Sequence, residues 1–186
     1  MTDKPALRQH LRSLRRRLAA EAPDAAERAA ALVRLDRLPA FRIVSGYVAQ
    51  GSEIDPSPLM TRLASAGAAP ALPFAASRDA VLAFRLWNPA DDLEPDAFGV
   101  PAPPLSAASV APDLVIAPLL AFDRKGGRLG QGAGHYDRTL ANLRATRGVF
   151  VLGLAYAGQE VDEVPIEAHD QRLDAILTET EYIAVR

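Results

Sequence analysis

The sequence contains no cysteine, and this absence removes several chemistries at once. A disulfide framework, a thiolate zinc site and a cysteine nucleophile are all excluded. Histidine is scarce as well, because the 186 residues include only three, too few for a histidine-rich metal site. Any catalytic or binding site must therefore be built mainly from carboxylates, cations, hydroxyls and backbone groups.

Long apolar runs are also missing, whereas a membrane-spanning helix needs about 20 predominantly apolar residues. Arginines interrupt the basic N-terminal segment every few positions, which argues against a signal peptide. The formal net charge of −2 argues against general nucleic-acid binding. We therefore expect a cytoplasmic protein with no membrane or nucleic-acid partner. No segment is typical of an obligate interface, so we also expect a monomer.

Short apolar runs alternate with helical patterns along most of the chain. Such alternation predicts an α/β fold with a mostly parallel sheet, which we expect to form one domain over residues 1–186. The expected strands lie at 41–49, 71–74, 81–87, 114–117, 149–155 and near 173–178, the third of them antiparallel. The expected helices lie in an N-terminal segment, 4–38, and at 57–67 and 136–145.

The first helix has two stripes of contrasting character. Asp3 can cap it and Pro5 suits its first turn. The apolar stripe consists of Leu7, Leu11, Leu14 and Leu18. The neighbouring basic stripe consists of Lys4, Arg8, Arg12 and Arg15. A basic stripe is usually a solvated face, and an RNA-binding helix is a second interpretation.

The segment 122–140 combines glycines with cations between an expected strand and an expected helix. Five glycines fall within nine residues, at positions 126, 127, 130, 132 and 134. Glycine lets backbone N–H groups approach a ligand closely, and a helix N-terminus adds unpaired donors and partial positive charge. The combination predicts an anion site, most often for phosphate, and a plain glycine-rich turn is the alternative. The spacing matches neither a Walker A loop nor a dinucleotide fingerprint.

The loop sequence FDRKGGRLGQGAGHYDR, residues 122–138, resembles the signature of the 5-formyltetrahydrofolate cyclo-ligase family. The family pattern is roughly F-D-x-x-G-x-R-L-G-x-G-x-G-x-Y-D. The chain departs from the family at Gln131 and His135, where an aromatic residue is more usual. Two further segments also resemble the family: FGVPAP at 98–103, where Ala102 replaces a glutamate, and VPIEAHD at 164–170.

The resemblance implies a three-layer α/β/α sandwich and an ATP-dependent reaction. In that reaction, 5-formyltetrahydrofolate and ATP give 5,10-methenyltetrahydrofolate, ADP and phosphate. The formyl oxygen is phosphorylated, nitrogen 10 attacks the activated carbon, the ring closes and phosphate departs. A protein that catalyses such a transfer mainly positions the reactants and stabilises charge.

The resemblance also implies roles for individual residues, with Arg128 and Tyr136 at the transfer site and Mg²⁺ held by Asp137 and Asp170. The residues expected to bind ATP are Lys4, Arg8, Arg128, Leu129, Gly130, Gln131, Gly132, Ala133, Gly134, His135 and Tyr136. Those expected to bind the folate substrate are Val48, Glu53, Phe98, Gln131, Gly132, Ala133, Gly134 and His135.

Simpler interpretations exist for three of these residues. Glu53 fits a solvated loop carboxylate, Phe98 a plug of the core, and Asp170 a turn cap.

Two other functional classes remain open from the residues alone. A relative that binds nucleotide, folate or RNA without turnover would fit the departures at Gln131, His135 and Ala102. An enzyme of the sugar-phosphate isomerase or CoA-transferase kind can share this type of sheet, but its reaction needs no ATP. Dependence on ATP therefore separates that second class from the cyclo-ligase interpretation.

Overall fold

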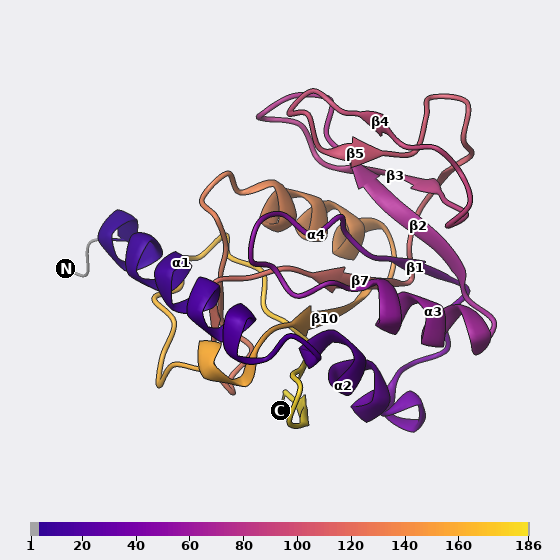
Figure 1. Ribbon diagram of the computed structural model, residues 1–186. Coiled ribbons are helices and arrows are strands. Elements are labelled where there is room, and N and C mark those ends of the chain that lie inside the picture. The colour runs from indigo at the N-terminus through magenta and orange to yellow at the C-terminus, as the bar shows by residue number, and fades with distance from the viewer. Residues whose placement is uncertain (1–3, 186) are drawn as a thin grey trace.

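A computed structural model describes residues 4–185, except for the side chain of Lys4 (Figure 1). The predicted cap at Asp3 and the predicted phosphate contact of Lys4 therefore lie outside the described residues. Four α-helices occur in the described range: α1 Lys4–Glu21, α2 Ala25–Leu32, α3 Ser57–Ser65 and α4 His135–Thr146. No described helix is long and apolar enough to cross a membrane.

A mixed sheet of eight strands organises the described chain, in the order β12-β11-β10-β7-β1-β2-β3-β6. The five central strands are parallel, whereas β12, β3 and β6 pair antiparallel at the two sides. The strands are β1 Ile43–Ser45, β2 Ala69–Phe74, β3 Ala83–Leu86, β6 Ser109–Val110, β7 Leu114–Ala117, β10 Phe150–Leu154, β11 Ala175–Leu177 and β12 Tyr182–Ala184. The predicted α/β fold and the antiparallel third strand are confirmed.

Helices cover both faces of the sheet, which gives the expected three layers (Figure 1). Leu114 and Ile116 of β7 pack with α2 and α3, whereas Val115 and Ala117 of the same strand pack with Leu140 of α4. Successive side chains of a strand point to opposite faces, so an uninterrupted apolar run is what a strand buried on both faces requires.

Two predicted elements are shorter in the structure. The strand expected at 41–49 ends at Ser45, beyond which the chain leaves the ladder for a loop. The helix expected to reach residue 38 ends at Leu32, and a short 3-10 helix, η1 Leu35–Arg37, follows. Val33 is extended, with φ −58° and ψ 130°, and its buried side chain packs in the core. Burial of Val33 therefore overrides the helical pattern.

Strands β1 and β7 are parallel neighbours in the sheet, but the chain continues from them toward opposite sides of the sheet. From β1 the chain passes through α3 to β2 on one side, and from β7 it passes through α4 to β10 on the other. Such a switch point leaves a crevice outside the carboxyl ends of the two strands, where open α/β sheets bind their ligands.

Helix α1 packs against the segment of the chain that follows β7. Leu11 is buried against Leu120, Ala121 and Leu129, and Leu7 and Leu14 pack at the edge of the same cluster. At the end of the helix, a Cβ added to Gly158 would lie 2.6 Å from a Leu18 methyl carbon, so glycine permits the close approach there. The predicted apolar stripe is thus the packing face of α1.

Candidate functional site

A cavity of about 1040 Å³ opens at the switch point between β1 and β7. The segments after both strands, the first turn of α4 and the basic side of α1 line it. Its volume reaches the upper end of the usual range for small-molecule sites, about 300–1,000 Å³. The cavity is therefore large enough for a sizeable small-molecule ligand.

The glycine segment divides into two parts with different tasks. Strands β8 Ala121–Phe122 and β9 Arg128–Leu129 form a hairpin, with Gly126 and Gly127 in its turn. Gly126 has φ +83°, and a Cβ there would meet the Leu173 carbonyl oxygen at 2.6 Å. These two glycines are structural, so the predicted anion site is restricted to positions 130, 132 and 134.

Asp123 holds the hairpin turn together from inside. Its carboxylate accepts the backbone N–H groups of Lys125, Gly127 and Val164, each at 2.9 Å. Because the side chain is buried, these three bonds satisfy it without water. The turn in this way fixes the direction in which β9 presents Arg128 to the cavity.

Helix α4 begins at the cavity without a side-chain cap. Gly134 occupies the N-cap position in the left-handed region, with φ 70° and ψ 8°. The N–H groups of a first helical turn have no partner within the helix, and the helix dipole adds partial positive charge there. The uncapped start of α4 therefore offers donors to an anion in the cavity.

Arg128 is a buried cation on the cavity wall. Its Nη2 donates to Asp137 Oδ1 at 2.7 Å, but its buried Nε has no hydrogen-bond partner among the described residues. Burial lowers the pKa of Arg128, an effect that the Asp137 charge opposes. Arginine stays charged even so, because its ordinary pKa lies far above physiological pH. A buried donor left unpaired is costly, so Nε is a candidate donor to an acceptor on a ligand.

Asp137 and Asp170 line the same cavity. Oδ1 of Asp137 also accepts the Gln171 N–H at 2.9 Å, and Oδ2 of Asp170 accepts the Glu167 N–H at 2.7 Å. The described residues contain no group of three or more metal-ligating side chains. Mg²⁺ is commonly held by one or two carboxylates together with substrate phosphates. The two aspartates therefore offer carboxylate oxygens of the kind that Mg²⁺ prefers.

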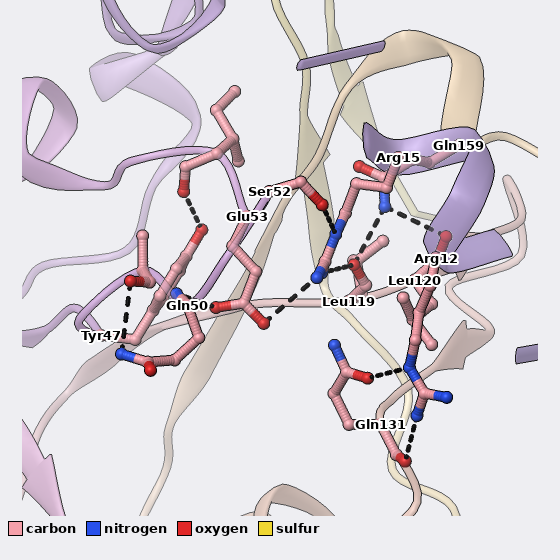
Figure 2. Close-up of polar contacts among 12 residues, drawn as sticks. Arg12, Arg15, Tyr47, Gln50, Ser52, Glu53, Leu119, Leu120, Gln131 and Gln159 are labelled. Atoms are coloured by element: carbon pink, nitrogen blue, oxygen red, sulfur yellow. Dashed lines mark hydrogen bonds and ion pairs between the residues drawn. The ribbon is translucent and has the colours of Figure 1, made fainter. Parts of the chain in front are cut away.

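Glu53 lies in the loop after β1 and is held by α1 (Figure 2). Its Oε1 lies 3.4 Å from Arg15 Nη1, and its Oε2 accepts the Gln50 N–H at 2.9 Å. Both side chains of the Arg15–Glu53 pair are below one tenth exposed. Val48, from the same loop, contributes an apolar wall to the cavity. Glu53 is thus a fixed carboxylate rather than a solvated one.

Two more arginines of α1 reach the glycine loop. Arg8 Nε donates to the Gly130 carbonyl at 3.1 Å, and Arg12 Nε donates to Gln131 Oε1 at 2.9 Å. Gly132 has φ +106°, and a Cβ there would lie 3.3 Å from the Arg8 guanidinium carbon. The basic stripe of α1 is therefore bound to the loop, which differs from a freely solvated face.

Phe98 and His135 meet at another part of the wall. Their ring centroids are 5.4 Å apart with a tilt of 58°. His135 Nε2 also lies 2.8 Å from the Arg78 carbonyl, which accepts a hydrogen bond from Arg138 at 2.7 Å. Phe98 is 46% exposed, so it is a cavity wall rather than a core plug.

Tyr136 lies in the first turn of α4 and lines the cavity. Burial raises the pKa of its hydroxyl, and the Glu53 charge raises it further. The hydroxyl is accordingly neutral at physiological pH. Within the part of the chain that the structure describes, it makes no side-chain hydrogen bond, which leaves it available to a ligand.

All the residues that the sequence placed at the site line this one cavity, with the exception of Lys4, whose side chain is not described. Sequence reasoning missed the tasks of Arg12, Arg15 and Asp123. The basic stripe contained a signal for the two arginines, but nothing in the pattern distinguished buried Arg15 from exposed Arg12.

Comparisons with known proteins agree with the resemblance. A family model described as the 5-formyltetrahydrofolate cyclo-ligase family matches residues 1–179. The cyclo-ligase of Mycolicibacterium smegmatis is 37% identical over 144 residues, covering 74% of this chain and 73% of that protein. The Haemophilus influenzae enzyme is 40% identical over 100 residues, covering 52% and 53%. The solution structure of Aquifex aeolicus 5,10-methenyltetrahydrofolate synthetase superposes with a TM-score of 0.80 at 27% identity, covering 100% of this chain and 94% of that one.

Proposed function

This chain belongs to the 5-formyltetrahydrofolate cyclo-ligase family, and from that premise we propose that it converts 5-formyltetrahydrofolate to 5,10-methenyltetrahydrofolate at the expense of ATP. The observation that carries the proposal is the buried Arg128 guanidinium, with an unpartnered Nε, on the wall of a cavity that also holds the uncapped start of α4. That combination suits a polyphosphate and is out of place in an empty apolar cleft.

The nucleotide and the folate would occupy neighbouring parts of the cavity. Gly130, Gly132 and Gly134 offer backbone donors beside Arg128, which suits the triphosphate. Glu53 accepts N–H donors, and the Phe98 and His135 rings supply an aromatic wall, which suits a pterin. Tyr136 lines the same cavity, and its neutral hydroxyl would orient the formyl oxygen.

ATP, when bound, supplies the phosphoryl group that turns the formyl oxygen into a leaving group. The residues of this chain hold the two substrates in line and compensate the charge that develops during transfer. Arg128 is the fixed cation for that charge, because its position is set by Asp137. Asp137 and Asp170 would hold Mg²⁺ against the phosphates, directly or through water.

The finer expectations also belong to the proposal. The arginines of α1 already bind protein acceptors at Gly130, Gln131 and Glu53, which favours a small-molecule partner over RNA. We further propose a monomer in the cytoplasm, folded as one domain, which gel filtration, cell fractionation and a single unfolding transition would test.

The decisive experiment follows the near-ultraviolet absorbance of methenyltetrahydrofolate. Purified protein is mixed with 5-formyltetrahydrofolate, ATP and Mg²⁺, and each component is then omitted in turn. A rise that requires both ATP and metal supports the proposal. ATP binding without any rise would favour a non-catalytic nucleotide- or folate-binding relative. If the protein shows no turnover and binds no ATP, the assignment of the glycine loop to a nucleotide must be dropped.

A further inference from the structure

Arg15 is the one arginine of α1 whose side chain is buried within the described part of that helix. Its guanidinium reaches three acceptors that lie far from Arg15 in the sequence (Figure 2). Nε donates to Ser52 Oγ at 3.2 Å, and Nη1 lies 3.4 Å from Glu53 Oε1 and 3.3 Å from the Leu119 carbonyl oxygen. Arg15 therefore joins α1 to the segments that follow β1 and β7.

A buried amide supports the same junction from the other side. Gln159 Nε2 donates to the Leu119 carbonyl at 2.9 Å and to the Leu120 carbonyl at 3.0 Å, while its Oε1 accepts the Tyr156 N–H at 2.8 Å. Gln159 is 1% exposed, so these bonds are shielded from water. Arg15 and Gln159 share the Leu119 carbonyl, as Figure 2 shows, and this fixes where the Arg15 charge lies.

The arrangement constrains Glu53 more than a loop alone would. Its second oxygen accepts the Gln50 N–H, so one oxygen is bound by its own loop and the other faces α1. A nearly buried carboxylate needs a cation or several donors to remain charged in place. Among the described residues, Arg15 is the cation that forms an ion pair with Glu53.

We propose that Arg15 is a positioning residue: it holds the Glu53 carboxylate in the orientation that accepts the folate and ties that carboxylate to the helix whose Arg8 and Arg12 hold the glycine loop. The inference rests on the proposed function, because it deepens the assignment of Glu53 to the folate. It predicts that one helix sets the geometry of both subsites, through different arginines.

The test separates the folate subsite from the nucleotide subsite by steady-state kinetics with each substrate varied. Arg15→Met removes the charge and keeps an apolar stem, and Arg15→Lys keeps the charge but not the forked donor geometry. Arg16→Met is the matched control, since Arg16 is exposed on the same helix and, among the described residues, its side chain bonds only Ser13. Circular dichroism and thermal unfolding establish that each variant is folded.

We expect R15M to raise the KM for 5-formyltetrahydrofolate about tenfold, the size of effect that corresponds to losing one hydrogen bond to a charged group. The KM for ATP should change less than twofold, and R15K should recover part of the loss. In an E53Q background, R15M should add little, because both changes act through one carboxylate. Equal rises in both KM values, full additivity with E53Q, or a folate KM within twofold of the R16M control would each overturn the proposal.

Two results would require further experiments: an R15M variant that does not fold, and an unaltered protein without turnover. If R15M does not fold, R15K and Ser52→Ala carry the test, and a folate KM unchanged in both overturns the proposal. If the unaltered protein shows no turnover, the proposed function fails first. The Arg15 proposal is then tested by calorimetry with 5-formyltetrahydrofolate, where R15K must weaken binding relative to R16M.

Discussion

Arg128 and Asp137 form a pair across the glycine loop, with Nη2 and Oδ1 separated by 2.7 Å. The same oxygen of Asp137 accepts the backbone N–H of Gln171, the residue that follows Asp170. One carboxylate oxygen thus sets the direction of the buried guanidinium and fixes the segment that carries the second aspartate. The anion site and the proposed metal site are consequently parts of a single hydrogen-bonded unit.

The first prediction concerns the charge of Arg128. Arg128→Lys should lower kcat/KM for ATP by at least tenfold. A single lysine ammonium group cannot both bond Asp137 and donate from the position of the unpartnered Nε. Arg128→Ala should cost about 100- to 1,000-fold, the usual loss when a donor to developing charge is removed. The methenyltetrahydrofolate absorbance assay measures both. Full turnover with unchanged ATP affinity in R128A would contradict the assignment of Arg128 to the phosphates.

The second prediction concerns the backbone of the glycine loop. Gly132→Ala introduces a side chain at φ +106°, where strain costs about 1–3 kcal/mol, and places Cβ 3.3 Å from the Arg8 guanidinium carbon. We expect the KM for ATP to rise with little change in the unfolding midpoint, since the loop can distort locally. Gly148→Ala is the control, because nothing lies within 4 Å of a Cβ there. Equal ATP KM values in the two variants would speak against a role for the loop conformation.

A third prediction tests the aromatic wall. Phe98→Ala removes the ring that lies 5.4 Å from the His135 ring, and we expect the folate KM to rise roughly two- to tenfold. The change should alter the free energy of unfolding by less than about 0.5 kcal/mol, because the side chain is half exposed. Leu105→Ala, at an exposed position outside the main cavity, should leave the folate KM unchanged.

Apolar periodicity predicted the sheet and glycine spacing predicted the anion loop, because both are local signals. The three layers and most of the cavity wall were implied by the family resemblance instead. It did not reveal that Gly126 and Gly127 belong to a hairpin, since two-residue strands such as β8 and β9 leave no periodic pattern. It also did not reveal the pairing of Arg15 with Glu53, because 38 positions separate them and only the folded chain brings them together. Long-range polar contacts of this kind depend on packing rather than on local composition.

The fourth prediction concerns stability rather than activity. Asp123→Asn replaces one acceptor oxygen by an NH₂ group that faces backbone N–H donors, so at least one buried bond is lost. The cost should be about 1–3 kcal/mol of the free energy of unfolding, measured in urea. Asp162→Asn, at an exposed position, is the control and should change stability by less than about 0.5 kcal/mol.

The fifth prediction is that stability depends on pH through Asp113, the residue that immediately precedes β7. Burial acts to raise the pKa of Asp113, but the Arg42 and Ile43 N–H groups and the Arg147 charge outweigh it and hold that pKa below its ordinary value. A depressed folded-state pKa means that the stabilisation is complete above the ordinary aspartate value, about 3.9, and is lost as the pH falls below it. Asp113→Asn should therefore be less stable than the unaltered chain at pH 7. That gap should narrow on acidification to pH 3, and a gap that widens would contradict the assignment.

The opposite courses of the chain after β1 and β7 make the two ligand loops separable pieces of architecture. Along the chain, residues 46–56 link β1 to α3, whereas residues 118–134 link β7 to α4 through the β8–β9 hairpin. A designer can therefore graft a different loop into one crossover while the other crossover keeps its own hydrogen-bonded scaffold. The graft must retain an acceptor for Arg15, because α1 is the brace that both modules share.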